Sequence, residues 1–121
     1  MQTIEQFLTS VRCGDVEFED AIGVIDAHYR YEPAAFRNGV GSDVICNAAG
    51  TNEGSCRIFA FAQQQKLSQA ETLTCFGRFY REVLAEPEGT SHANIRRFMR
   101  DGWDGIHFAA SPLMLRGSEI F

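Results

Sequence analysis

The sequence lacks any apolar run long enough to cross a membrane, and no stretch near its N-terminus joins basic residues to a long apolar block. We therefore expect a soluble protein without a visible Sec-type signal. Lysine is nearly absent as well: one lysine and ten arginines face 16 acidic residues, for a net charge of −5. This balance predicts no general affinity for nucleic acid or for an anionic membrane.

Metal-binding spacings are also missing. The four cysteines, Cys13, Cys46, Cys56 and Cys75, show no CxxC pattern, and the three histidines form no HxH or HxxxH pair. Three of the cysteines sit in apolar patterns, which favours free thiols in a reducing compartment over disulfides. We expect neither a metal nor another cofactor, and a cytoplasmic location.

The overall amino-acid composition indicates an ordinary globular protein. At 121 residues, with 45% hydrophobic and 22% charged residues, the chain is long enough for one domain over residues 1–121 with its own core. Ten phenylalanines predict a core built on aromatic packing. The tail from about residue 111 is expected to be loosely held.

The stretch from Ala49 to Ala62 runs from a turn-rich segment into the most apolar one, and we interpret it as a capped helix entering the core. Thr51 or Asn52 could supply the oxygen that caps the first N–H groups. The apolar run alone would also fit a buried strand, but residues 63–67 extend it past usual strand length and favour a helix over 53–66. A helix that is apolar on all sides should lie at the centre of the fold.

Other helices are predicted at capping signals that precede apolar periodicity. They begin at Thr3, after Asp15, at Ser68 and at Thr90 or Ser91, and the Ser68 helix is expected to continue until Pro87 approaches. Residues 33–54 predict a long ordered loop with one short strand, at 34–36 or at 44–46. The alternation at 106–108 predicts a strand paired with residues 35–36. The fold class is thus mainly α: a compact single-domain helical fold of about five helices around a central buried helix, with at most a small two-stranded β element.

Two polar helix starts are the candidate binding site. N–H groups at a helix start favour anions, and two helices that share one core should bring their starts to the same side of the molecule. We therefore predict a cleft for a carboxylate or phosphate. The candidate ligand-binding residues are Gly50, Thr51, Asn52, Gly54, Ser55, Thr90 and Ser91.

A catalytic alternative uses Cys56, which would lie in the first turn of the central helix, where a thiolate is favoured. His92 would be its paired base, and Glu53 or Asn52 would orient the histidine. This arrangement predicts a small cysteine-dependent hydrolase or transferase. Because core residues follow Cys56 at once and no catalytic motif is complete, a buried structural thiol and a non-enzymatic binding protein are the favoured interpretation.

The chain resembles the HopJ family, type III effector proteins of plant-associated bacteria. The resemblance rests on residues 31–39, 75–81 and 89–103 and above all on residues 49–62, AGTNEGSCRIFAFA. It implies a bacterial protein that is a candidate for secretion into a host cell through a type III system, and it offers no catalytic residues. With the helix starts, it predicts an effector or regulatory protein that binds an unidentified protein or a small anionic ligand.

Overall fold

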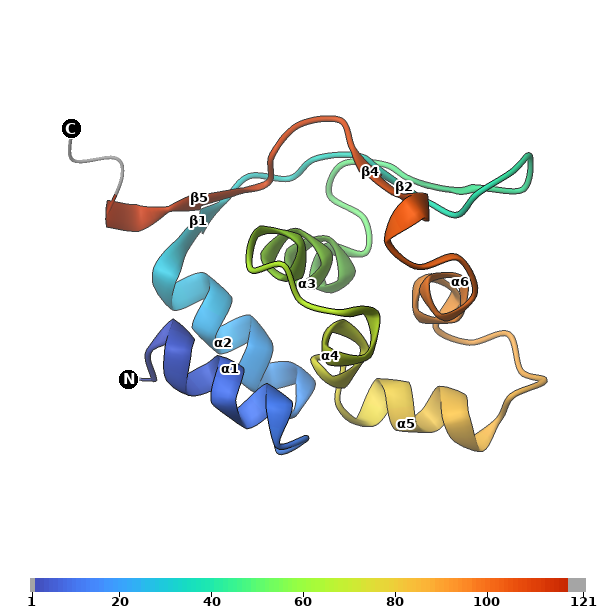
Figure 1. Cartoon of the computed structure of the whole chain (residues 1–121). Helices are drawn as coiled ribbons and strands as arrows, with labels where there is room; N and C mark the ends of the chain where they lie inside the picture. The colour runs from blue at the N-terminus through green and yellow to red at the C-terminus, as the bar shows by residue number, and fades with distance from the viewer. Residues whose placement is uncertain (1, 118–121) are drawn as a thin grey trace.

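The computed structural model describes residues 2–117. This part of the chain contains six α-helices, five of which are arranged around a central one. The helices are α1 (Ile4–Arg12), α2 (Phe18–His28), α3 (Glu53–Gln64), α4 (Gln69–Thr74), α5 (Arg78–Ala85) and α6 (Ala93–Asp101), and the 3-10 helix η1 (Gly102–Gly105) follows α6. The strands are β1 (Tyr29–Tyr31), β2 (Phe36–Asn38), β3 (Ile45–Asn47), β4 (Ile106–Phe108) and β5 (Leu113–Leu115). The strands form a layer on one side of the molecule, with α3 directly beneath them (Figure 1).

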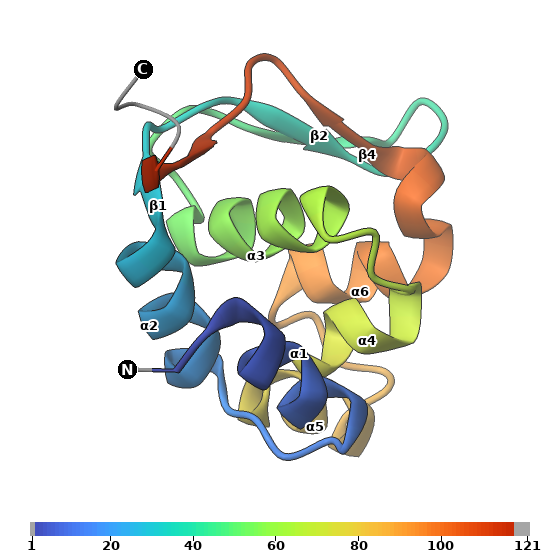
Figure 2. The ribbon, with the colours of Figure 1, turned by 60° about the vertical axis from the view of Figure 1, so that its left-hand side comes forward.

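Helix α3 is the buried centre that its apolar sequence predicted. Cys56 and residues 58–62 are all buried, and α3 lies between the strands and the layer formed by α1, α4 and α5 (Figure 2). The ring of Phe59 contacts the rings of Phe36, Phe76 and Phe98 at centroid distances of 6.0, 5.4 and 4.9 Å. Burial of such a side chain contributes roughly 1.5–3 kcal/mol, so the aromatic core around α3 holds the elements together.

The capping signals locate two helix starts correctly. The hydroxyl of Thr3 accepts a hydrogen bond from the Gln6 N–H at 3.0 Å, and the hydroxyl of Ser68 accepts one from the Glu71 N–H at 3.1 Å. The start of α2 differs, because it lies at Glu17 rather than Asp15. Helix α3 also ends at Gln64, before the predicted residue 66.

The continuous helix predicted from Ser68 is wrong, since the chain breaks into α4 and α5 at Gly77. Gly77 has a φ of +57°, and a Cβ there would lie 2.5 Å from Glu17 Oε1 and 2.7 Å from the Phe18 nitrogen. The start of α2 therefore occupies the space that a helical side chain would need. This break raises the helix count to six in the described chain, against about five expected.

The β content exceeds the small two-stranded element that was expected. One antiparallel sheet has the order β3-β2-β4, and a separate pair joins β1 to β5. The predicted pairing of residues 106–108 with the Phe36 region is confirmed, because Phe36 lies opposite Phe108. One short strand was predicted, at 34–36 or at 44–46, and the structure has a strand that overlaps each of these segments, β2 and β3. Each strand is three residues long, so alternation is a weak signal, and the paired strands β1 and β5 were not predicted.

The tail is more firmly held than predicted. Leu113 is 4% exposed, its carbonyl accepts a hydrogen bond from Gln64 Nε2 at 3.1 Å, and β5 pairs with β1. The prediction of a loose tail from about residue 111 is therefore wrong for the strand, and its last part, 118–121, lies outside the described residues. None of the helices in residues 2–117 has the length and apolar character needed to cross a membrane.

Candidate functional site

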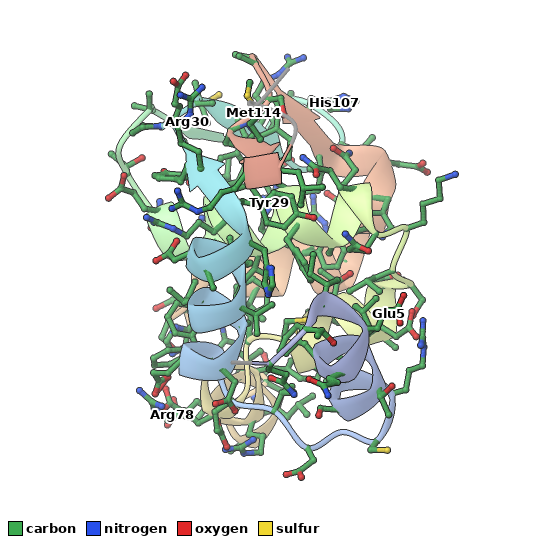
Figure 3. All side chains as sticks on the ribbon, turned by 90° about the vertical axis from the view of Figure 1, so that its left-hand side faces the viewer. Glu5, Tyr29, Arg30, Arg78, His107 and Met114 are labelled. Carbon is green, nitrogen blue, oxygen red and sulfur yellow. The ribbon has the colours of Figure 1, made fainter. Side chains whose placement is uncertain are left out.

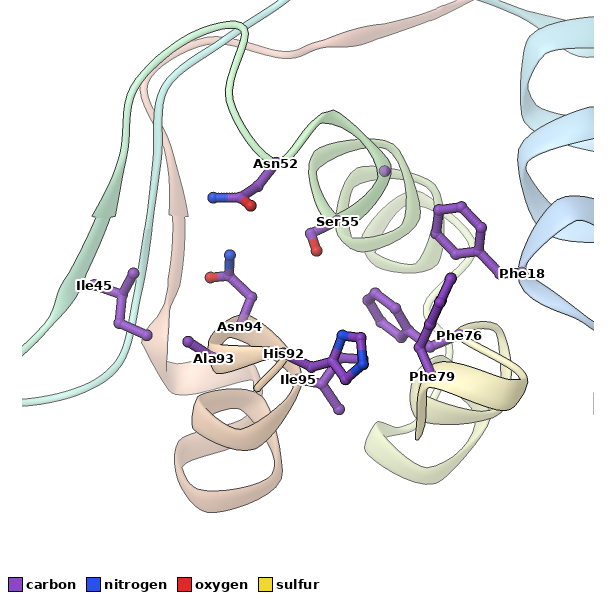
Figure 4. Close-up of a pocket in the computed structure, with 11 residues that line it drawn as sticks. Phe18, Ile45, Asn52, Ser55, Phe76, Phe79, His92, Ala93, Asn94 and Ile95 are labelled. Atoms are coloured by element: carbon purple, nitrogen blue, oxygen red, sulfur yellow. The ribbon is translucent and has the colours of Figure 1, made fainter. Parts of the chain in front are cut away.

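The starts of α3 and α6 meet at one pocket of about 330 Å³. Asn52, Gly54 and Ser55 line it from α3, and His92, Ala93 and Asn94 line it from α6 (Figure 4). Aromatic and aliphatic side chains complete the wall: Phe18, Ile45, Phe76, Phe79 and Ile95. The expectation that both helix starts lie on the same side of the molecule is confirmed.

The backbone enters both helices in the same unusual way. The residues before them, Asn52 and His92, have φ values of +49° and +55°, in the left-handed region that non-glycine residues seldom adopt. Neither side chain caps its helix. Capping by Thr51 or Asn52 is therefore wrong, since the Thr51 hydroxyl donates to the Ala48 carbonyl at 2.6 Å instead. First-turn N–H groups of both helices are left without a side-chain cap beside the pocket.

A network of asparagines holds the two helix starts against the sheet. It contains all four asparagines of the sequence, Asn38, Asn47, Asn52 and Asn94. The Asn47 Oδ1 accepts hydrogen bonds from Asn52 Nδ2 at 2.7 Å and from Asn94 Nδ2 at 2.9 Å. Asn38 Nδ2 donates to the Asn94 carbonyl at 2.9 Å. Because buried amides are costly to leave unpaired, the network fixes the position of each helix start.

Sequence reasoning missed this network. It identified Asn52 as a candidate cap, while Asn38 and Asn47 fell in a predicted loop. The network needs β2 beside α6, a contact between segments 56 positions apart in the chain. The one available signal is that three of the four asparagines fall within residues 38–52.

The apolar wall contains a close contact that explains a glycine. Phe18 and Phe79 pack edge to face with ring centroids 5.1 Å apart. A Cβ on Gly54 would lie 2.5 Å from Phe18 Cζ, so only glycine fits there without moving the ring. The His92 ring packs on Phe79 at 5.2 Å, and its Nε2 lies 2.8 Å from Glu82 Oε1.

The predicted ligand-binding residues divide into two groups. Asn52, Gly54 and Ser55 line the pocket, and Figure 4 shows the Ser55 hydroxyl pointing into it. The others precede the helices without lining the pocket: Gly50, Thr51, Thr90 and Ser91.

The proposed cysteine triad is not assembled. Cys56 is 1% exposed, its Sγ lies 3.7 Å from the Ala34 carbonyl, and burial raises the pKa of its thiol. Glu53 accepts a hydrogen bond from the Tyr31 hydroxyl at 3.1 Å, away from the histidine. His92 is held by Glu82 instead. The geometry gives Cys56 the character of a structural thiol.

Two arginines that lie among apolar residues, Arg57 and Arg78, are engaged in ion pairs at the surface. Arg57 Nε donates to Asp26 at 2.9 Å and its guanidinium lies 3.8 Å from the centre of the Tyr31 ring. Arg78 pairs with Glu19, at the end of the molecule opposite the strands (Figure 3). No arginine or lysine is among the residues described as lining the pocket, so N–H groups and polar side chains are what it offers an anion.

Comparison with known proteins finds one family and one close structural relative. The family model for the HopJ type III effector protein matches residues 4–113. A crystal structure of VPA0580, a protein of unknown function, is similar with a TM-score of 0.88 and 44% identity, and the match covers 94% of each chain. No curated protein matches the sequence. The pocket is therefore the best available guide to what the chain does.

Proposed function

The chain belongs to the HopJ family of type III effector proteins, and from that premise we propose that it is an effector or regulatory protein that binds a small anionic ligand between the starts of α3 and α6. The observation that carries the proposal is the convergence of two uncapped helix starts on one pocket. N–H groups at such starts carry partial positive charge and donate hydrogen bonds to anions.

The chemistry of the pocket favours a carboxylate on a flat apolar body. Phe18, Phe76 and Phe79 supply an aromatic wall, and Asn52 and Ser55 supply polar groups. Without a lysine or arginine in the described lining, and with Glu82 bound to His92 nearby, a single negative charge suits the site better than a doubly charged phosphate. A volume of about 330 Å³ is at the small end for ligand sites and suits a compound the size of benzoate.

Family membership supports an action inside a host cell after type III secretion, and the same pocket would accept an acidic or aromatic side chain of a partner protein there. A translocation assay with a reporter fused to the chain tests this route. Reporter signal in host cells that depends on a working secretion system is the expected result, and signal that is absent or independent of that system argues against it.

Calorimetric titration tests the binding proposal. We expect benzoate to bind, and uncharged benzyl alcohol to bind about three- to 30-fold more weakly, because each of the two helix termini contributes roughly 0.3–1 kcal/mol to anion binding. Inorganic phosphate should bind more weakly than benzoate. Ser55→Asp places a carboxylate at the helix start and should abolish benzoate binding, whereas Ser10→Asp on α1 should leave it unchanged. Equal affinity of benzoate for both variants would overturn the proposal.

A further inference from the structure

The pocket also contains a side-chain hydroxyl, that of Ser55. Ser55 lies in the first turn of α3 and its hydroxyl points into the pocket (Figure 4). Among residues 2–117, no hydrogen-bond partner is found for this hydroxyl. Ser55 directly precedes Cys56 on α3. The Cys56 thiol is buried in the core, whereas the Ser55 hydroxyl faces the pocket.

A histidine with an acidic partner lies in the same pocket. His92 Nε2 is 2.8 Å from Glu82 Oε1, and the ring is further held by its contact with Phe79. A carboxylate only accepts hydrogen bonds, so in the neutral ring the proton lies on Nε2 and Nδ1 keeps its lone pair. Nδ1 is then the basic atom of the ring, and Figure 4 shows the ring across the pocket from Ser55.

The backbone of the histidine is consistent with a functional role. His92 and Asn52 are two of the three non-glycine residues with positive φ in the described chain, and both line this pocket. Left-handed backbone at such residues costs free energy and is concentrated at functional sites. The asparagine network holds Asn52 in this conformation, and the contact with Phe79 holds His92.

We infer that this pocket hydrolyses small carboxylic esters, with Ser55 as the nucleophile, His92 as the general base and Glu82 as a positioning residue. The inference rests on the proposed function, because the acid part of the ester would occupy the carboxylate site. Ser55 and His92 line the same pocket without a hydrogen bond between them, so the two side chains would take up the roles of a serine, histidine and acid triad as the ester binds.

The step balances with water as the only co-reactant. Ser55 Oγ forms a bond to the carbonyl carbon while its proton passes to His92 Nδ1. The first-turn N–H groups of α3 and α6 stabilise the oxyanion. The carbon to alkoxy-oxygen bond then breaks, and the departing alcohol takes the proton from His92. Water attacks the acyl-serine in the same way and releases the carboxylic acid.

Covalent labelling of the intact protein tests the inference. We expect a fluorophosphonate to add one phosphonyl group, and peptide mapping to place it on Ser55. Ser10→Ala, in which a hydroxyl bonded to the Gln6 carbonyl is removed from α1, should label at the wild-type rate. Labelling of His92→Gln should be about 100-fold slower or more, as for loss of a general base.

Turnover of p-nitrophenyl acetate provides the second readout. Ser55→Ala should reduce it to the rate of the buffer, and Glu82→Gln should lower kcat with KM unchanged, which loss of fold alone would not do. The absence of an adduct, an adduct on Cys56 or another residue, or turnover that persists in Ser55→Ala would overturn the inference. If wild-type protein binds benzoate but is not labelled by the fluorophosphonate, the esterase inference is wrong and the proposed binding function stands.

Discussion

Asn38 and Asn94 are 56 positions apart in the chain, yet Asn38 Nδ2 donates hydrogen bonds to both the backbone carbonyl of Asn94, at 2.9 Å, and its Oδ1, at 3.0 Å. Asn38 is fully buried and Asn94 is 7% exposed. Through this contact β2 holds the start of α6, and through Asn47 the same network reaches the start of α3. The position of the pocket therefore depends on hydrogen bonds between amides.

The first prediction concerns this contact. Asn38→Asp keeps the shape of the side chain but turns the donor into an acceptor that faces two carbonyl oxygens. We expect the free energy of unfolding in urea to fall by about 2–4 kcal/mol, because a buried group loses its partners and gains repulsion. Asp15→Asn, an exposed exchange of the same two residue types, should change it by less than about 0.5 kcal/mol. Equal effects of the two substitutions would show that the network does not hold the fold.

The second prediction concerns the break between α4 and α5. Gly77→Ala combines a left-handed backbone with a Cβ that would lie 2.8 Å or less from atoms of Glu17 and Phe18. We expect a loss of about 2–4 kcal/mol in the free energy of unfolding. Gly14→Ala is the matched control, since Gly14 has a φ of +75° and nothing within 4 Å of an added Cβ. It should cost only about 1–2 kcal/mol, and no difference between the two variants would contradict the close contact.

The third prediction concerns the thiols. Cys13 and Cys46 are exposed, whereas Cys56 and Cys75 are buried. Burial raises the pKa of the Cys56 thiol, and it raises that of Cys75 to about 12, so neither forms a thiolate near neutral pH. We expect iodoacetamide to modify Cys13 and Cys46 in native protein, and all four cysteines in urea. Selective modification of Cys56 in native protein would restore the cysteine-dependent enzyme as a hypothesis.

The fourth prediction concerns acid. Glu17 accepts hydrogen bonds from the Arg81 side chain at 2.6 Å and the Arg78 N–H at 2.9 Å, and these contacts lower its pKa below the ordinary 4.5. A carboxyl group whose pKa is lower in the folded state stabilises the protein at pH values above its unfolded-state pKa. This stabilisation is lost as the pH falls through the folded-state pKa. We expect the free energy of unfolding to decrease as the pH is lowered below about 4.5, and to decrease less in Glu17→Gln. Identical pH profiles of unfolding for the two proteins would contradict this role.

Much of the fold could be predicted because its signals are local. The apolar run at 56–62 identified α3 as the core, and the capping boxes at Thr3 and Ser68 fixed two helix starts. The break at Gly77 could not be predicted, since it depends on the start of α2, which is 60 positions distant in sequence from Gly77.

The site was predicted in place but not in detail. Its two helix starts were identified from polar residues that precede apolar ones. Ser55 was among the predicted ligand-binding residues, but Cys56 was the candidate nucleophile, because α3 is buried on nearly all sides and offers no polar stripe to show that Ser55 faces the pocket and Cys56 the core. The acidic partner of His92 was also missed, since Glu82 lies on α5 and reaches it only through the tertiary fold.

The most direct measurement of the central claim is a titration of ¹⁵N-labelled protein with benzoate, followed by amide chemical shifts. If the pocket between α3 and α6 binds the carboxylate, the largest shifts will be those of the first-turn amides of Gly54, Ser55, Ala93 and Asn94. Largest shifts on the outer face of β2 and β4, at Arg37 and His107, or no shifts at millimolar benzoate, would contradict it.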